Sequence, residues 1–538
     1  MALRIICGAF NLFYEDYMKK LFILLLILSL ALTGCDVIKA WLPELPQGPD
    51  TDEKPDTDRK PGASDECADH TDSDDDGICD ICYESVIVLI DLYSINDLHG
   101  KVSKSDSQPG LGGLTTYLKN NTDENSVLVS SGDMWQGSSE SNLTYGAFIT
   151  DWMSRVGFAA MTLGNHEYDW GREHISNNAR LAQFPILAIN IYEKSTGQRA
   201  DYAEASVVIE RGGIEIGIIG AIGDCYSSIS GEVVGDVYFK VGDELTELVK
   251  AESERLRAQG VDFIIYSLHD GYGKSSNGVG VISNNNLRSY YDIELSDGYV
   301  DIVFEGHTHQ SYVLSDTKGV YHLQGDGENR GIAHAELRYN EANLNMSVKS
   351  PEIIKSSVYA RQDEDGLIGE LLEKYKDEIS AANRLLGYNP SYLSGNTIKS
   401  IVARLYYEAG VERWGGEYDI ALGGGFISVR NPYNLKAGNV YYSDVYSILP
   451  FDNQLVLCSV SGCDLYHKFL TTSNSNYYVY GKNLESLKES IEFGKTYFIV
   501  TDTYTSTYAY NNLTEVARYT EGVFARDLFA AYIEELDD

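Results

Sequence analysis

The sequence predicts an α/β protein with at least two domains. Apolar runs of strand length recur along the chain, such as FAAMTL at residues 158–163 and VDIVFE at 300–305, and each stops abruptly at a glycine. Runs bounded in this way are typical of strands buried in a sheet. The chain has 538 residues, and one hydrophobic core rarely grows past about 250 to 300 residues. We therefore expect a second domain after the one that carries these strands.

Polar clusters directly follow five predicted strands, which lie within residues 85–95, 125–131, 158–163, 261–268 and 300–305. In open α/β sheets ligands bind outside the carboxyl ends of the strands, so the clusters converge if the strands share one sheet. Imidazole and carboxylate ligands without thiolates suit zinc, manganese or iron. The clusters contain more candidate ligand residues than one metal ion can bind, which predicts a site for two metal ions. They are Asp97, His99, Asp133, Asn165, His166, Asp169, His269, His307 and His309.

The polar clusters follow one another in an order that is informative about the protein family. They read INDLHG, SSGDMWQGS, LGNHEYDWG and EGHTH, and with them residues 86–538 resemble the bacterial 5'-nucleotidase family, whose catalytic domain is a calcineurin-like metallophosphoesterase. The resemblance implies a four-layer β-sandwich flanked by helices at residues 85–350. It also implies two metal-ligand sets that share one bridging carboxylate: Asp97, His99 and His309 for one ion, Asn165, His269 and His307 for the other, and Asp133 between them.

His166 is expected to act on the substrate, since Asn165 beside it is already a predicted ligand. In the family this histidine, paired with the aspartate three residues later, here Asp169, stabilises or protonates the reacting phosphoryl group. A carboxylate fixes the orientation of an imidazole and favours its charged form, as a general acid near pH 7 requires. Glu167 is expected to be structural.

The remainder of the chain is expected to form a connecting helix at 351–388 and a smaller α/β substrate-binding domain at 389–538. The resemblance implies that Phe451 and Tyr504 stack on the two faces of a nucleobase and that Asn453 contacts it. Two aromatic rings can hold any base in this way.

This second domain also departs from the family pattern. Where the family has N-G-G-G-I-R, the chain has Leu422 and Ile427 in place of Asn and Arg, and the nearest arginine is Arg430. The glycine run 423–425 between them would let a ligand approach the backbone. The usual G-G-D is replaced at residues 508–510. The preferred substrate therefore stays open among nucleoside monophosphates, 2',3'-cyclic nucleotides and nucleotide sugars. The alternatives are a hydrolase of a non-nucleotide phosphoester or of a sulfur ester, and an inactive surface binding protein.

The N-terminal region indicates export. Residues 1–35 contain a basic start, a short apolar run and the ending L-T-G-C, which is typical of a secretory signal and resembles a bacterial lipoprotein box. Cys35 would then carry the lipid and hold the enzyme outside the cytoplasm, at the cell membrane or surface.

Residues 36–84 form an acidic segment that is expected to be a solvated tether. Within it, the alternating Asp72, Asp74 and Asp76 are typical of a calcium loop, although no Glu stands at the twelfth position. Zinc is the second interpretation and an unoccupied acidic segment the third. The zinc ligands would have C-x-x-H and C-x-x-C spacing and would be Cys67, His70, Cys79 and Cys82.

The net charge of −38 argues against a nucleic-acid polymer as partner, because phosphate backbones are bound by clustered Lys and Arg. It is compatible with a secreted enzyme whose metals attract an anionic substrate. The pattern of residues does not reveal the oligomeric state.

We predict that Cys35→Ala releases the protein from membranes or leaves it unprocessed, because the thiol that would carry the lipid is lost. Cell fractionation followed by immunoblotting measures this. Equal membrane retention of the variant after signal cleavage would contradict the lipid anchor.

Overall fold

The computed structural model describes residues 70–80, 85–104, 109–229, 231–272, 278–282, 297–430, 433–510, 512–519 and 523–536. The predicted leader with Cys35 lies outside the described residues, as do Cys67 and Cys82 of the tether. Among the described residues, no helix has the length and apolar character needed to cross a membrane.

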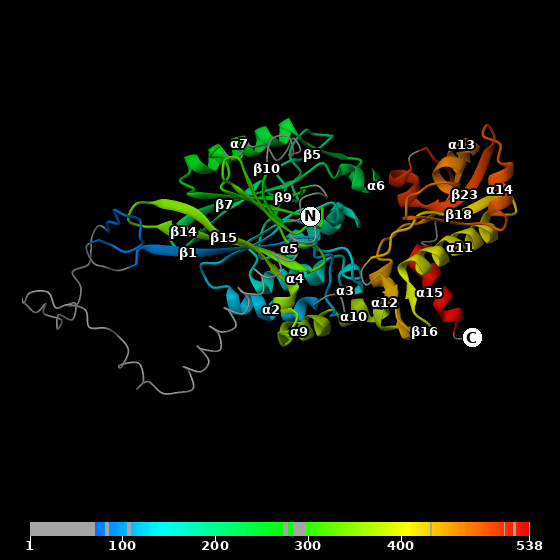
Figure 1. Cartoon of the computed structure of the whole chain (residues 1–538), viewed down its shortest axis with the longest axis horizontal. Helices are drawn as coiled ribbons and strands as arrows, with labels where there is room; N and C mark the ends of the chain where they lie inside the picture. Colours follow the sequence, from blue (N-terminus) through cyan, green and yellow to red (C-terminus); the bar gives the residue numbers. More distant parts are fainter. Residues whose placement is uncertain are drawn as a thin grey trace, which may run out of the picture. The chain divides into compact units, whose positions relative to one another are not determined.

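Two sheets form the first domain (Figure 1). The first has the order β15 (Asn345–Lys355), β14 (Gly331–Asn340), β1 (Ile87–Ile95), β2 (Val127–Ser130), β3 (Ala160–Thr162), β4 (Ile186–Leu187). The second has the order β10 (Gly278–Ile282), β12 (Tyr312–Asp316), β13 (Tyr321–Gln324), β11 (Ile302–Glu305), β9 (Phe263–His269), β7 (Ile214–Ile222), β6 (Ser206–Arg211).

The two sheets pack face to face. Ile90 and Leu92 of the first sheet share one buried cluster with Ile216, Ile265 and Phe304 of the second. Alternate residues of a strand point to opposite faces, so each sheet also presents an outer face that helices cover. This gives the four-layer arrangement of helices, sheet, sheet and helix that the family resemblance implies.

Helices cover the outer faces. The first sheet packs in one cluster with α2 (Gly110–Asn121), α4 (Ala147–Val156) and α5 (Arg172–Leu181). The second packs with α7 (Asp243–Ala258). In α7 the buried Leu245, Val249 and Leu256 recur at helical spacing. Acidic residues occupy its first turn and basic residues its last, which suits the helix dipole.

All five predicted strands are present, as β1, β2, β3, β9 and β11. The assumption that they share one sheet is wrong, since β9 and β11 belong to the second sheet. Their polar clusters still meet because buried hydroxyls join the sheets at this end. Ser267 Oγ on β9 lies 3.1 Å from Ser131 Oγ after β2 and accepts a 2.8 Å hydrogen bond from Thr162 Oγ1 on β3.

The predicted single helix at 351–388 is also wrong. Strand β15 continues to Lys355, and the following segment forms α8 (Ser356–Tyr359), α9 (Gly366–Lys374) and α10 (Lys376–Ile379). A new helix begins at α9 because the side chain of Asp365 accepts a hydrogen bond from Leu367 N. These short helices pack against the first domain's core.

The second domain is built on a five-stranded sheet. Its order is β22 (Tyr477–Tyr480), β18 (Ile420–Phe426), β23 (Thr496–Asp502), β21 (Leu455–Ser461), β24 (Thr514–Arg518). Helices α11 (Gly395–Trp414) and α15 (Ala525–Glu535) share its larger core. A side chain at Gly423 would collide with the backbone of Tyr407 in α11. At this position the glycine run thus serves helix packing rather than approach by a ligand.

Candidate active site

The predicted metal ligands occupy strained loops at the carboxyl ends of the strands. Asp97, His99, Asp133, His307 and His309 all have φ between 49° and 68°, a left-handed conformation that is uncommon outside glycine. Such strain tends to collect at functional sites and persists only where the surrounding structure enforces it.

Close packing around the site explains two of the motif glycines. Gly132 has a φ of 89°, and a Cβ there would lie 2.5 Å from His269 Nδ1. A Cβ at Gly164 would collide with the carboxylate of Asp133. The G-D and G-N-H-E motifs therefore need glycine so that the two loops can meet.

The first predicted ligand set is assembled as expected. Asp97, His99 and His309 present ligand atoms that all lie within 4.8 Å of one another. His99 Nε2 is 3.1 Å from His309 Nε2, and His309 Nε2 is 3.4 Å from Asp97 Oδ1.

The second set lies beside the first. Asn165 Oδ1 is 3.1 Å from His269 Nε2 and 2.9 Å from His307 Nδ1. Asp133 Oδ2 lies 3.3 Å from His269 Nε2 and 4.0 Å from His99 Nε2. The Asp133 carboxylate is therefore placed between the two sets, as a bridging ligand requires.

Hydrogen bonds to backbone carbonyls orient two of the imidazoles. His99 Nδ1 lies 2.9 Å from Gln136 O, and His269 Nδ1 lies 2.7 Å from Ser131 O. Because a carbonyl only accepts, Nδ1 carries the proton in both rings and Nε2 faces the centre of the site. Metal-binding histidines are commonly held in this way.

The donor set fits cations. Asp97 and Asp133 are buried, with exposed fractions of 0% and 1%, and neither forms an ion pair with Lys or Arg in the described part of the chain. Burial would raise the pKa of Asp97, but His309 and His269 lower it to about 2. Burial would lower the pKa of His269, but Asp133 raises it to about 10. In the described part of the chain, imidazoles alone balance these carboxylates, Asp133 through His269 and Asp97 through His309. Bound divalent ions would displace the imidazole protons and supply the positive charge instead.

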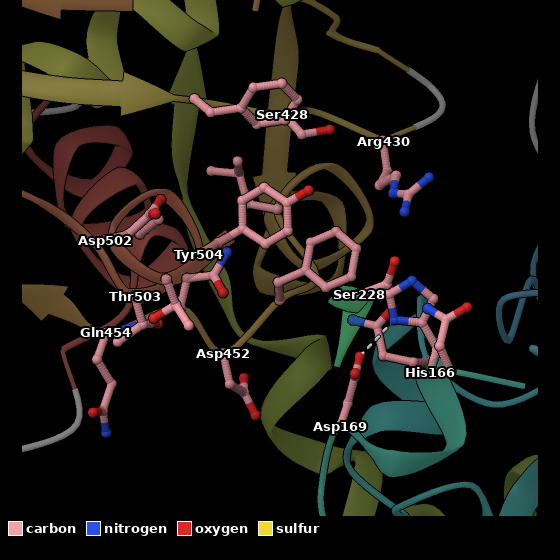
Figure 2. Close-up of a pocket in the computed structure, with 18 of the residues that line it drawn as sticks. His166, Asp169, Ser228, Ser428, Arg430, Asp452, Gln454, Asp502, Thr503 and Tyr504 are labelled. Atoms are coloured by element: carbon pink, nitrogen blue, oxygen red, sulfur yellow. Dashed lines mark hydrogen bonds and ion pairs between the residues drawn. The ribbon is translucent and has the colours of Figure 1, made fainter. Parts of the chain in front are cut away.

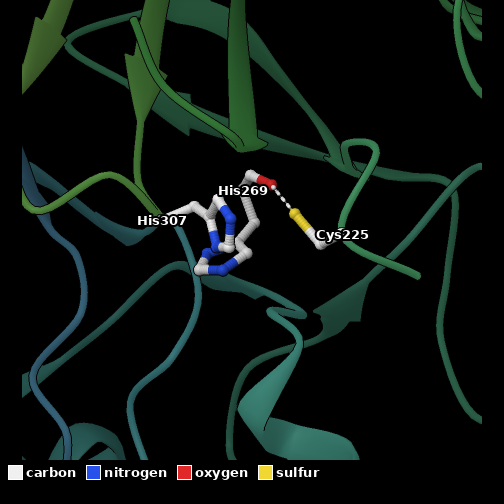
Figure 3. A group of neighbouring side chains, drawn as sticks. All are labelled: Cys225, His269 and His307. Carbon is white, nitrogen blue, oxygen red and sulfur yellow. Dashed lines mark hydrogen bonds between the residues drawn. The ribbon is translucent and has the colours of Figure 1, made fainter. Parts of the chain in front are cut away.

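Cys225 also approaches this site. Its Sγ lies within 4.8 Å of ligand atoms of His269 and His307. Figure 3 shows Sγ directed at the backbone carbonyl of His269, 3.5 Å away. Burial raises the pKa of the thiol well above its usual range, and the neutral thiol therefore supports the His269 backbone.

His166 and Asp169 form the expected pair (Figure 2). His166 Nδ1 lies 2.9 Å from Asp169 Oδ2, and His166 N donates to Asp133 Oδ1 over 2.8 Å. Burial would lower the pKa of His166, but the Asp169 and Asp133 carboxylates outweigh it and raise the pKa. This environment favours the protonated imidazole that a general acid needs.

Glu167 has a larger role than sequence reasoning gave it. Its buried carboxylate accepts four backbone N–H groups, from Asp133, Met134, Trp135 and Gly164, at 2.7 to 3.2 Å. Burial and the charge of Asp133 raise its pKa to about 7. Glu167 joins the loop of the bridging aspartate to the loop of Asn165 and His166.

A cavity of about 780 Å³ extends from this site into the second domain. His166 and Asp169 line one part of it. The Phe451 ring is 5.4 Å from the His166 ring, and the Arg430 guanidinium is 5.0 Å from the Phe451 ring. The predicted substrate residues all line this cavity: Phe451, Asn453, Tyr504 and Arg430.

The two family departures differ in position. Ile427 lines the cavity, so an apolar side chain stands in the cavity wall where the family pattern has arginine. Leu422 is buried in a hydrophobic cluster of the second domain.

The loop that carries Phe451 is held from both domains. Pro450 O accepts hydrogen bonds from Gln136 Nε2 at 3.1 Å and Asn142 Nδ2 at 3.0 Å. It also accepts from Arg526 Nη1 at 3.4 Å, and Arg526 forms an ion pair with Asp452. Sequence reasoning missed these supports, because no local motif marks them.

The prediction of a solvated tether is wrong for residues 70–80, because Asp72 and Cys79 are buried and this segment packs against the first domain. There Asp72, Asp74 and Asp76 bring carboxylate oxygens within 4.8 Å of one another. Asp72 Oδ2 accepts hydrogen bonds from Gly77 N and Asn340 Nδ2, both at 2.8 Å. Two members of the zinc set lie outside the described residues. Calcium or zinc in the tether therefore stays a prediction.

The amino-acid sequence is similar to those of known phosphoester hydrolases. The sequence model of the calcineurin-like phosphoesterase family matches residues 92–311. A 5'-nucleotidase of Vibrio parahaemolyticus is 24% identical over 417 residues, which cover 68% of this chain and 71% of that protein.

Solved structures share the fold. A 5'-nucleotidase precursor from Thermus thermophilus superposes with a TM-score of 0.60 at 18% identity, covering 84% of this chain and 97% of that one. The sulfate thiohydrolase SoxB of Thermus thermophilus gives 0.59 at 14% identity, covering 83% and 94%. The fold alone therefore does not choose between phosphoester and sulfur-ester chemistry.

The family match and the assembled ligand set together identify the chemistry. The chain is a metal-dependent phosphoester hydrolase with a calcineurin-like phosphoesterase domain, homologous to the 5'-nucleotidases.

Proposed function

We propose that the protein is a lipid-anchored enzyme outside the cytoplasm that hydrolyses nucleoside 5'-monophosphates for salvage of nucleosides and phosphate. One observation carries the proposal. The same cavity contains the His166–Asp169 pair beside the metal ligands and the aromatic side chains of Phe451 and Tyr504. A nucleotide would use both groups of residues, the catalytic pair for its phosphate and the aromatic rings for its base.

Two divalent ions bound by the seven ligands would lower the pKa of water and polarise the phosphoryl oxygens. The residues of the chain do the rest. Asp169 accepts the Nδ1–H of His166, which leaves Nε2 for the substrate. From Nε2 the imidazolium donates a proton to the leaving 5' oxygen or stabilises the charge that grows on the phosphoryl group. Glu167 holds the loop of Asp133 and the loop of Asn165 and His166 in fixed positions during the reaction.

Hydrolysis of a sulfur ester is the alternative function, since SoxB shares the fold. The intact pair of His166 and Asp169 favours a phosphoester. Cyclic nucleotides and nucleotide sugars fall within the proposed chemistry, and a substrate panel containing them with thiosulfate esters separates the classes.

Removal of metal should abolish hydrolysis of p-nitrophenyl phosphate, because the buried carboxylates and imidazoles have no catalytic function without cations. Chelation followed by addition of Mn²⁺ or Zn²⁺ should restore the activity, with two ions per chain in the elemental analysis. Asp74→Asn, in the tether loop, is the matched control and should retain full activity. Undiminished hydrolysis after complete metal removal would refute the dinuclear site.

His166→Ala should lower kcat by about a hundredfold or more, as loss of a general acid does, while metal content stays near that of the wild type. Asn165→Ala provides the contrast, since it removes a ligand and should lower metal content as well. The measurements are steady-state kinetics and elemental analysis. A His166→Ala enzyme with normal kcat would exclude the histidine from the chemistry.

Phe451→Ala should raise KM for AMP by about tenfold or more, since stacking on an aromatic ring contributes roughly 1 to 3 kcal/mol per base. Hydrolysis of p-nitrophenyl phosphate should hardly change, because this substrate has no base. Equal losses for both substrates would show that Phe451 is a packing residue.

A further inference from the structure

Gln324, the last residue of β13, is a buried amide next to the loop that carries two of the candidate metal ligands. Its exposed fraction is 0%. Strands β11 and β13 run parallel, with Phe304 beside Leu323, so Gln324 lies level with the end of β11 and with the loop 306–310 that follows it. A buried amide is costly unless it is hydrogen-bonded, and the partners of Gln324 indicate its role.

Gln324 uses both donors and both acceptor sites of its amide. Nε2 donates to Gly306 O over 2.7 Å and to Tyr312 Oη over 3.2 Å. Oε1 accepts from Gln310 N at 2.7 Å and from Thr308 Oγ1 at 3.0 Å. The orientation of the amide is fixed, because Gly306 O can only accept a hydrogen bond and Gln310 N can only donate one.

Three of these partners flank His307 and His309, one before the first histidine, one between the two and one after the second. The two histidines have φ of 68° and 50°, and such strain persists only where the surrounding structure enforces it. Gln324 is placed to enforce it, since this one side chain holds the loop at three points.

The two histidines belong to different ligand sets. His307 Nδ1 lies 2.9 Å from Asn165 Oδ1 of the second set, and His309 Nε2 lies 3.1 Å from His99 Nε2 of the first set. The loop therefore contributes one ligand to each predicted ion. A side chain that fixes the shape of this loop also fixes the distance between these two ligands.

Neighbouring groups hold Gln324 in its turn. Tyr312 Oη donates to the Glu305 carboxylate and accepts from Tyr272 N over 2.9 Å. A Cβ at Gly271 would lie 2.1 Å from Gln324 Nε2, so glycine at this position makes room for the amide. The amide thus belongs to a buried network that keeps it in one orientation.

We propose that Gln324 is a positioning residue of the metal centre, which holds His307 and His309 at the spacing that two divalent ions require. The inference rests on the two-metal site of the proposed function and assigns a determinant of metal affinity outside the seven ligands. Packing at the end of the sheet is the simpler role of a buried amide, and replacement of Gln324 would then affect stability alone. The two roles predict different results for metal binding.

Gln324→Met tests the proposal, because Met has nearly the same length and volume but makes none of the four hydrogen bonds. The dissociation constant for Mn²⁺, measured by isothermal titration calorimetry on metal-free protein, should rise by about tenfold to a hundredfold, as it does when a residue that orients metal ligands is lost. The electron paramagnetic resonance spectrum of the Mn²⁺-loaded variant should also differ from that of the wild type, since altered ligand spacing changes the magnetic coupling between the ions.

Asn178→Leu is the matched control. Asn178 in α5 is also a buried amide, with an exposed fraction of 2%. It donates to Tyr145 O over 2.7 Å and to His174 O over 3.0 Å, and it accepts from Thr150 Oγ1 at 3.0 Å. None of these partners is a candidate ligand. The variant should lower the Tm of the metal-free protein, as Gln324→Met does, but retain the metal affinity and the spectrum of the wild type.

Thr308→Val removes one of the four hydrogen bonds and leaves the amide in place. Its dissociation constant for Mn²⁺ should rise by about threefold, as expected for the loss of one hydrogen bond. This variant decides the question if Gln324→Met does not fold.

Wild-type affinity for Mn²⁺ in Gln324→Met, or in Thr308→Val if the first variant does not fold, would overturn the proposal. An equal loss of affinity in Asn178→Leu would also overturn it, because the effect would then follow stability. A wild type that binds fewer than two Mn²⁺ ions would refute the dinuclear site of the proposed function. A wild type that binds two ions, with no change in the variants, would refute only this inference.

Discussion

The burial of Asp97 and Asp133 among histidines is the constraint on which the rest of the structure depends. Among the described residues, these two carboxylates form ion pairs with imidazoles and not with Lys or Arg, and buried charge is costly unless it is paired or bound to metal. Five candidate ligand residues adopt a left-handed backbone conformation that directs their side chains into the site. Glycines stand where the loops that carry these residues come into contact. Bound metal ions would balance this charge, so the fold and the proposed chemistry depend on the same atoms.

The two-sheet architecture makes this arrangement possible. Ligands come from the ends of strands in both sheets, and buried hydroxyls of Ser131, Thr162 and Ser267 join the sheets directly below the metal loops. Glu167 then fixes two loops of the first sheet through four backbone N–H groups. A second set of contacts, centred on Pro450 O, brings Phe451 of the other domain to His166. The cavity can therefore accept the phosphate and the base of one substrate.

Much of this could be predicted from the sequence, because the determining patterns are local. Five strands could be found from apolar runs. The seven candidate ligands and the pair His166–Asp169 could be found from short motifs together with their resemblance to the 5'-nucleotidase family. The assignment of β9 and β11 to a second sheet was missed, since strand pairing depends on residues far apart in the chain. The connecting helix was predicted as continuous because helical spacing does not reveal the cap at Asp365. Glu167, Arg526 and Pro450 act through backbone groups or across domains, and no spacing rule reports such contacts.

The central claim is that two metal ions share Asp133. Crystals of the protein grown with Mn²⁺, measured at a wavelength where manganese scatters anomalously, test it most directly. The account predicts two peaks about 3.5 to 4 Å apart on either side of the Asp133 carboxylate, one near His99 and His309 and one near His269 and His307. A single peak, or two peaks without Asp133 between them, would contradict it.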